Sequence, residues 1–297
     1  MAAFALLLLY PIYAGVMYAN QTAILFPAAS DKHHPLDAPL PADGRLVELP
    51  ASFGKVRAVY LRADTNTARG AAIVYLHGNF ECVQNSFALL QPLVAADIAV
   101  LQVEFPGFCG ADGQPSYMSI AETASLSYEW LERQPGVDPA RIVVMGYSIG
   151  GGAAGELATR HAARALVLLS TYTSMQDMAH RYGLPRMLVR YPYDTLQRVR
   201  EFAGPVFVEH GRRDKVVPFA MGSALAGAKP SNEFVALDCG HDGCRFDESI
   251  FAERLPSWLA KQHIIAASSA SRPAESPTAP AADAVSASRA AADSAWK

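Results

Sequence analysis

The sequence predicts an α/β fold in which a mainly parallel, eight-stranded sheet is flanked by helices. Eight short apolar runs occur between residues 45 and 263, and most are followed by a segment of helical periodicity, which is the pattern of repeated βαβ units. Most of these runs are continuously apolar, as in strands that are buried on both faces. The 297 residues are enough for one large core, and we expect a single domain over residues 45–263.

The order of the elements follows from these runs and from the loops that separate them. We expect strands at residues 46–49, 56–61, 71–76, 98–103, 142–145, 165–169, 206–209 and 233–237. We expect helices at residues 83–96 and 120–133, directly after Ser148, and at residues 249–263. Residues 170–204 form a long insertion between the sixth and seventh strands, and we expect a small helical cap there.

The two ends of the chain differ from the domain in composition. Residues 1–26 carry no charged side chain and approach the roughly 20 apolar residues of a membrane-spanning helix, so they predict a single N-terminal hydrophobic anchor. A cleaved signal peptide, which would make the protein secreted or periplasmic, and a hairpin packed on the domain are the alternatives. Without flanking positive charges, the side of the membrane is not defined. Residues 27–44 are predicted to be a linker.

The C-terminal segment at residues 264–297 is rich in Ala, Ser and Pro, and we expect it to be disordered because it has too few large apolar side chains to offset the entropy of ordering. The net charge of the whole chain is −3, which favours no nucleic-acid partner. We expect no cofactor and no metal ion. The oligomeric state is left open.

A serine follows the fifth predicted strand in the pattern Gly146-Tyr147-Ser148-Ile149-Gly150. A strand, a very tight turn and a helix in this order form a nucleophile elbow. The turn strains the backbone at Ser148, and a Cβ at position 146 or 150 would collide with a neighbouring strand or helix. The Ser148 hydroxyl then lies at a helix N-terminus, where developing negative charge is favoured. Ser148 is the predicted nucleophile.

A serine hydroxyl needs a base to take its proton and an acid to orient that base. Asp214 follows the seventh predicted strand and His241 follows the eighth. Because parallel strands end at the same edge of a sheet, Ser148, Asp214 and His241 are expected to converge there. The competing candidates for acid and base are two histidines near strand ends, a glutamate inside a strand, and two aspartates in the turn of His241 itself: His77, His210, Glu209, Asp238 and Asp242.

The oxyanion of the reaction needs backbone donors that are in place before the reaction begins. One is the amide of Ile149, directly after the nucleophile. The other is expected after the third strand, in His77-Gly78-Asn79-Phe80, where the glycine lets the backbone approach the substrate. The amide of Asn79 is the best candidate there, and the amide of Phe80 is the second candidate.

As a set, the motifs around these residues resemble those of the α/β-hydrolase superfamily. They are His77-Gly78-Asn79, Pro106-Gly107, Gly113-Gln114-Pro115-Ser116, Gly146-Tyr147-Ser148-Ile149-Gly150-Gly151, His210-Gly211-x-x-Asp214-x-x-Val217-Pro218 and Gly240-His241. The closest likeness is to its membrane-anchored branch, called Bem46-like or α/β-hydrolase-domain 13/17-like, whose hydrophobic anchor also ends in a Phe-Pro segment. The likeness covers residues 16–261. It implies a Ser-His-Asp hydrolase of carboxylic esters or thioesters.

The sequence departs from that family at two places. The usual Arg-Gly-Tyr-Gly-x-Ser loop is replaced by Phe105-Pro106-Gly107-Phe108-Cys109-Gly110-Ala111, which alters the wall of the pocket. The residue after His241 is Asp242, where the family usually has Asn. Neither change removes one of the three predicted catalytic residues.

Two further features are left open by the sequence. Eight basic residues and four acidic residues lie between Arg181 and Lys215, and this surface is either simply solvated or seated against anionic headgroups. Four cysteines occur, Cys82 and Cys109 in two loops near the site and Cys239 and Cys244 on either side of His241. Disulfides between Cys82 and Cys109, or between Cys239 and Cys244, are possible.

The sequence therefore predicts a serine hydrolase that cleaves carboxylic esters or thioesters through an acyl-serine intermediate, at a membrane. Its substrate would be an acyl ester, a thioester or a lipid-like molecule of unknown chain length. A serine peptidase or amidase would use the same triad. A non-catalytic binding module is the third interpretation, and it predicts a missing triad member, whereas all three are present.

Overall fold

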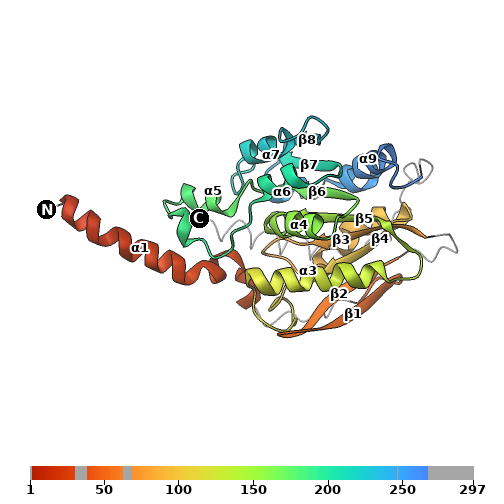
Figure 1. Ribbon diagram of the computed structural model, residues 1–297, viewed down its shortest axis with the longest axis horizontal. Helices are drawn as coiled ribbons and strands as arrows, with labels where there is room; N and C mark the ends of the chain where they lie inside the picture. Colours follow the sequence, from red (N-terminus) through yellow and green to blue (C-terminus); the bar gives the residue numbers. More distant parts are fainter. Residues whose placement is uncertain (1, 31–38, 63–68, 246, 267–297) are drawn as a thin grey trace.

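The computed structural model describes residues 2–30, 39–62, 69–245 and 247–266. Its centre is one eight-stranded sheet of order β1-β2-β4-β3-β5-β6-β7-β8, shown in Figure 1. β2 is antiparallel to both of its neighbours, and the remaining pairs are parallel. The mainly parallel eight-stranded sheet expected from the sequence is therefore confirmed. The strands are β1 (Gly44–Ala51), β2 (Gly54–Leu61), β3 (Gly70–Leu76), β4 (Ala99–Val103), β5 (Val137–Tyr147), β6 (Ala165–Leu169), β7 (Val206–Gly211) and β8 (Glu233–Leu237).

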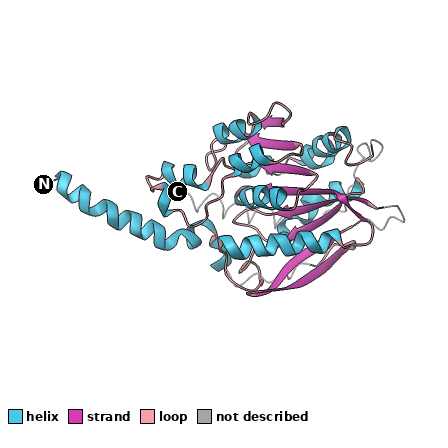
Figure 2. Ribbon diagram, viewed as in Figure 1, coloured by secondary structure: helices cyan, strands magenta, loops and turns pink. Residues whose placement is uncertain are grey.

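Helices cover both faces of the sheet, as Figure 2 shows. Side chains of α3, α4 and α7 pack into the core on one face, and those of α2, the π-helical turn η4 and α9 pack into the core on the other. Every residue of β6 is buried between these layers, which is why its sequence is continuously apolar. The bounds are α2 (Phe87–Ala95), α3 (Tyr117–Glu132), α4 (Ile149–Arg160), α7 (Phe219–Ala226), η4 (Ile250–Arg254) and α9 (Leu255–Lys261).

Two elements begin three or more residues before the start that the sequence pattern predicts. The helix α3 begins at Tyr117 because the Ser116 hydroxyl caps it, accepting a hydrogen bond from the Ser119 amide at 3.0 Å. The strand β5 begins at Val137, which pairs with Gly70 across a register shift. The first half of β5 is largely exposed and does not alternate between buried and exposed residues, so the apolar pattern of the sequence does not reveal that part of the strand.

The N-terminal helix α1 (Ala2–Leu25) projects from the body of the protein (Figure 1). Its second half contacts the cap: the Gln21 side chain donates to the carbonyl of Leu188 at 2.6 Å and accepts from the Arg190 amide at 2.8 Å. Among the described residues, no helix has the length and apolar character needed to cross a membrane. The structure therefore does not support the transmembrane anchor predicted for residues 1–26.

Directly after α1, the short helix η1 (Pro27–Ser30) begins the segment predicted as a linker. Phe26 is buried, and its ring packs 6.4 Å from that of Phe105 and 5.0 Å from that of Tyr191. Residues 31–38 of the predicted linker and residues 267–297 of the predicted tail lie outside the described residues. Ile264 is fully buried, so packing continues past residue 263, where we expected the domain to end.

The insertion at residues 170–204 forms a small helical cap, as predicted. It contains α5 (Met175–Arg181), the 3-10 helix η3 (Arg186–Leu188) and α6 (Thr195–Glu201). The helix α5 is capped by the Ser174 hydroxyl and α6 by the Asp194 carboxylate, each accepting from a backbone amide. These two N-capping side chains explain why helices begin there although the segment shows no extended helical period of apolar residues.

Two disulfides join the four cysteines, and they are the two pairings that the sequence left open. Cys82, after β3, is bonded to Cys109, after β4. Cys239 is bonded to Cys244, which lies in the short helix α8 (His241–Arg245). Both disulfides therefore hold loops at the carboxyl ends of the strands.

Candidate active site

Ser148 lies at the sharp turn between β5 and α4. Its φ of 51° is in the left-handed region, which is strained for a residue with a Cβ. The turn is held by the Ser148 amide, which donates to the carbonyl of Leu169 at 2.9 Å, and by the Thr171 hydroxyl, which donates to the Ser148 carbonyl at 2.6 Å. The elbow expected from the glycine spacing is thus present.

The two glycines of the motif allow this turn for steric reasons. A Cβ on Gly146 would overlap the backbone of Gly150, and a Cβ on Gly150 would overlap the carbonyl oxygens of Leu76 and His77. Only glycine therefore lets α4 start this close to the end of β3.

The structure brings the three predicted catalytic side chains together. The Nε2 atom of His241 lies 2.9 Å from Oγ of Ser148, and its Nδ1 atom lies 2.7 Å from Oδ2 of Asp214. Ser148 and Asp214 are buried, and the His241 side chain is only 10 % exposed. With Nδ1–H donating to Asp214, Nε2 is left as the acceptor for the serine proton. This arrangement suits the transfer of a proton from Ser148 to His241.

The carboxylate of Asp214 accepts hydrogen bonds on both oxygens. Its Oδ1 accepts from the amides of Val216 and Val217, each at 2.8 Å. Its Oδ2 lies near His241 and also 3.3 Å from Nε2 of His210. Burial opposes ionisation, but the hydrogen bonds from the two histidines outweigh it and hold the pKa of Asp214 at about 2. Asp214 is therefore a carboxylate at neutral pH.

Tyr147 packs against His241. The Tyr147 ring lies 5.4 Å from the imidazole ring of His241, and its hydroxyl donates to Oδ1 of Asp242 at 3.0 Å. The disulfide between Cys239 and Cys244 closes the loop that carries His241. Asp242, where the resembling family usually has Asn, thus serves as an acceptor for the residue beside the nucleophile.

The two predicted oxyanion donors are the backbone amides of Ile149 and Asn79. Ile149 is the first residue of α4, so its amide has no acceptor within the helix. The amide of Asn79 has no hydrogen-bond partner among the residues that the structure describes, whereas the preceding amide, of Gly78, donates to the Glu81 carboxylate at 2.5 Å. The two predicted donors are therefore available to a substrate, and their role as an oxyanion hole stays a prediction.

A buried glutamate lies behind the triad. Glu209, on β7, is 1 % exposed, and one of its oxygens lies 3.4 Å from the Ser170 hydroxyl. Burial raises the pKa of Glu209 to about 7, and the nearby Asp214 adds to that rise, while His210 and Ser170 oppose it. Glu209 has no contact with Ser148 or His241 in the structure, in agreement with its place inside a strand.

The competing histidines and Asp238 occupy structural positions. His210 is fully buried and contacts the carbonyl of Val217 at 2.9 Å. Asp238 is exposed and paired with Arg213 at 3.0 Å. His77 is fully buried and pairs with Glu104. No signal in the sequence indicates that His210 also supports Asp214, because the contact depends on how the loop after β7 folds back.

The cap contains a cavity of about 500 Å³ that none of the triad residues lines. It is polar, with Asp177, Arg186 and Arg200 among its lining residues. Of the apolar side chains in the cap, Leu184 is buried, but Met187 is 88 % exposed. Met187 therefore belongs neither to a closed pocket nor to a core of the cap.

Two clusters of side chains have the composition of metal ligands in the described part of the chain. They are Cys82 with Glu104 and Cys109, and Glu209 with Cys239 and Cys244. In each cluster the two sulfur atoms are bonded to each other and are thus not thiolate ligands. The expectation that the protein needs no metal ion or cofactor stays a prediction.

Comparison with known proteins agrees with this geometry. The model of the alpha/beta hydrolase family matches residues 73–209, which include the elbow and Glu209. An uncharacterized protein of Mycobacterium tuberculosis is 32 % identical over 208 residues, which are 68 % of this chain and 74 % of that protein. The alpha/beta hydrolase domain-containing protein WAV2 of Arabidopsis thaliana is 26 % identical over 213 residues, which cover 65 % of this chain and 66 % of WAV2.

Solved structures share the same fold at low sequence identity. Est1E from Butyrivibrio proteoclasticus with ferulic acid bound has a TM-score of 0.64 and 17 % identity, covering 73 % of this chain and 99 % of that one. Thermogutta terrifontis esterase 2 phosphonylated by sarin has a TM-score of 0.63 and 17 % identity, covering 77 % and 98 %. The chain belongs to the alpha/beta hydrolase family.

Proposed function

We propose that this protein is a serine hydrolase that cleaves carboxylic esters or thioesters through an acyl-serine intermediate. The observation that carries the proposal is the line of contacts from Ser148 Oγ to His241 Nε2, at 2.9 Å, and from His241 Nδ1 to Asp214 Oδ2, at 2.7 Å. Family membership supports it, as does the presence among proteins of this fold of an esterase that sarin phosphonylates.

In the proposed reaction, Ser148 Oγ attacks the acyl carbon while its proton passes to Nε2 of His241. The amides of Asn79 and Ile149 stabilise the oxyanion, and one such donor contributes about 10²–10³ to kcat in a hydrolase of this type. Collapse of the tetrahedral intermediate expels the alcohol or thiol, which takes the proton from His241. Water, activated by the same imidazole, then attacks the acyl-serine and releases the acid.

A matched pair of substrates tests the proposal against a peptidase or amidase that uses the same triad. We expect the full chain to hydrolyse p-nitrophenyl butyrate, and to act far more slowly on butyryl-p-nitroanilide, which has the same acyl group and an amide bond. The Ser148→Ala variant should lose ester turnover by several orders of magnitude. Ester turnover that survives in Ser148→Ala would refute the assignment of the nucleophile, and equal rates on both substrates would favour the amidase.

The second part of the proposal is that the protein acts at a membrane, on acyl esters, thioesters or lipid-like substrates. It rests on the uncharged first 30 residues and on exposed apolar side chains of α1, including Leu9, Ile12 and Val16. Flotation of the full chain with phospholipid vesicles checks it. Recovery of the protein only in the dense fraction would contradict it.

A further inference from the structure

The oxyanion loop, residues 77–83 between β3 and η2 (Val83–Ser86), is supported by a buried carboxylate that the reaction itself does not use. We propose that His77 and Glu104 form a buried ion pair, with both ring nitrogens of His77 protonated, and that this pair positions the oxyanion loop. The positioning role rests on the hydrolase activity proposed above, whereas the protonation state of His77 does not depend on it.

The contacts of the His77 ring carry the inference. His77 and Glu104 side chains are both fully buried. The Nδ1 atom of His77 lies 2.6 Å from the carbonyl oxygen of Gly78, and its Nε2 atom lies 2.8 Å from Oε1 of Glu104. A carbonyl oxygen is only an acceptor, so Nδ1 must donate, and an ionised carboxylate at Nε2 requires a second donor. A ring that donates at both nitrogens is an imidazolium.

The surroundings of Glu104 favour its ionised form. Its Oε2 accepts from the Val83 amide at 3.1 Å, and a hydrogen bond from a backbone amide stabilises a carboxylate. The Phe105 amide also lies 3.2 Å from Nε2 of His77. That contact alone would suit a neutral ring that accepts at Nε2, but Nε2 and a carboxyl oxygen 2.8 Å apart need a proton between them. The Val83 amide that donates to Oε2 favours the ionised carboxylate and thus places this proton on Nε2.

The other groups that face His77 are one carboxylate, which favours the imidazolium, and two aromatic rings, which oppose it by burying the imidazole. Glu81, in the loop itself, is buried, and its carboxylate accepts from the Gly78 amide. The rings of Phe105 and Phe108 lie 4.3 Å and 5.3 Å from the imidazole and exclude water. Burial disfavours the imidazolium, but the charges of Glu104 and Glu81 outweigh burial and raise the pKa of His77.

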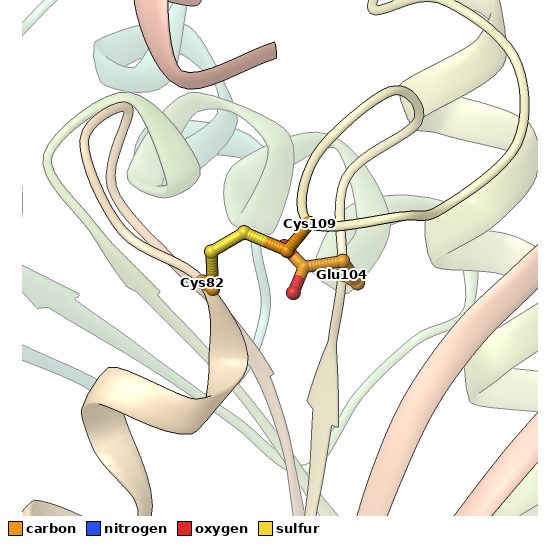
Figure 3. Close-up of side chains that lie close together, drawn as sticks. All are labelled: Cys82, Glu104 and Cys109. Atoms are coloured by element: carbon orange, nitrogen blue, oxygen red, sulfur yellow. A yellow bond between two sulfur atoms is a disulfide. The ribbon is translucent and has the colours of Figure 1, made fainter. Parts of the chain in front are cut away.

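The ion pair joins the oxyanion loop to the loop that follows β4, and so fixes the position of the oxyanion loop. His77 and Val83 are the two ends of the oxyanion loop, and Glu104, at the end of β4, contacts both. The disulfide between Cys82 and Cys109 links the same two loops, and Figure 3 shows the Glu104 side chain beside it. A carboxylate oxygen of Glu104 and the two sulfur atoms lie within 4.8 Å of one another.

Glu104 is therefore a positioning residue: it acts on the free amide of Asn79 through the backbone that His77 and Val83 anchor. Loss of its charge should leave His77 without a counterion and allow the loop to shift. Because the Asn79 amide is expected to matter most when the oxyanion forms, the shift should lower kcat more than it changes KM.

The protonation state is tested directly by nitrogen-15 NMR of the ring of His77 in the full chain at pH 8, assigned through its backbone. The expected result is that both ring nitrogens of His77 carry a proton at a pH where an ordinary histidine is neutral. A ring protonated at one nitrogen only would overturn the ion pair. This measurement is valid whether or not the protein is an esterase.

The positioning role is tested by kinetics with Glu104→Gln, which keeps the size of the side chain and removes its charge. We expect kcat on p-nitrophenyl butyrate to fall about 10- to 100-fold with KM within about threefold, and Glu104→Asp to recover part of the loss. Glu122→Gln, at an exposed hydrogen bond to Ser52, is the control and should match the wild type.

An unchanged kcat in folded Glu104→Gln, beside an active wild type, would overturn the positioning role alone. An inactive wild type would instead overturn the proposed function. If Glu104→Gln does not fold, Glu104→Asp carries the test, because a shorter carboxylate keeps the charge and displaces the loop: kcat equal to that of the wild type would then contradict the inference.

Discussion

The contacts of Asp214 make the Asp214→Asn substitution a sharp test of the proposed mechanism. Both oxygens of the carboxylate accept hydrogen bonds, Oδ1 from the amides of Val216 and Val217 and Oδ2 from the ring of His241. If the oxygen of an asparagine keeps the two backbone amides, its NH₂ group faces Nδ1–H of His241, and two donors then oppose each other. The imidazole should respond by adopting the other tautomer, with the proton on Nε2.

That tautomer has no free acceptor for the proton of Ser148. A triad in which the acid is replaced by its amide loses roughly 10⁴ in kcat for this reason, and we expect a loss of that order on p-nitrophenyl butyrate, with KM changed little. Asp238→Asn is the matched control, because Asp238 also lies near the His241 loop but is exposed and paired only with Arg213. Exposed pairs of this kind contribute little, so its kcat should equal that of the wild type.

The same substitution has a calculable effect on stability. Asp214 has its pKa lowered from 3.8 to about 2, and a gap of about 1.8 units corresponds to roughly 2.5 kcal/mol in favour of the ionised folded protein. Since the pKa is lower in the folded state, this contribution is present above about pH 4 and is lost as the pH falls through about 2. Asp214→Asn should thus lower the free energy of unfolding by roughly that amount at pH 7 and by about half of it at pH 3.

Urea unfolding at the two pH values, together with steady-state kinetics at pH 7, measures both effects on the same samples. A kcat within tenfold of the wild type, in a variant with the expected loss of stability, would show that Asp214 is a structural acid and not the partner of His241. A stability difference that does not depend on pH would refute the electrostatic explanation of its low pKa.

Two further predictions concern the surroundings of the triad. Burial raises the pKa of Glu209 from 4.5 to about 7, so the folded protein retains a proton that the unfolded chain releases, and wild-type stability should fall as the pH rises from 4.5 to 7. Glu209→Gln should remove this fall and be more stable than the wild type by roughly 3 kcal/mol at pH 8. Equal pH profiles of the two proteins in urea unfolding would contradict this prediction. Gly150→Ala should abolish the folded elbow, because its Cβ would overlap the backbone carbonyls of Leu76 and His77. Gly155→Ala is the control and should fold normally, because its Cβ would meet only side chains, at 3.2 Å or more. Circular dichroism and thermal melting compare the two variants, and a folded Gly150→Ala with wild-type activity would refute the steric argument.

Most of the fold could be predicted from the sequence because the strands are buried on both faces and their apolar runs are continuous. The exceptions have local causes. The polar first half of β5 pairs through its backbone, and α3 starts early because of one capping serine, Ser116. The helices α7 and α8 follow directly from turns at Pro218 and Cys239 and are too short to show a helical period.

The positions of Ser148, Asp214 and His241 could be predicted because each follows a strand end and carries its own glycine or turn signal. The residues that hold Asp214 and the oxyanion loop in place could not be predicted from the sequence. His210 lies in β7, the strand that Asp214 follows, and Glu104 follows β4, but only the folded chain brings His210 to Asp214 and Glu104 to His77. Nor does sequence spacing decide which cysteines pair, because Cys82 and Cys109 are 27 positions apart and a helix and a strand lie between them.

Covalent labelling tests whether Ser148 is a nucleophile that His241 activates. The full chain is incubated with a fluorophosphonate, and the adduct is counted by intact mass and located by peptide mass spectrometry. We expect one phosphonyl group per chain, on the peptide that contains Ser148, and none in the Ser148→Ala variant. Folded wild-type protein that takes up no label, or label that persists in Ser148→Ala, would contradict it.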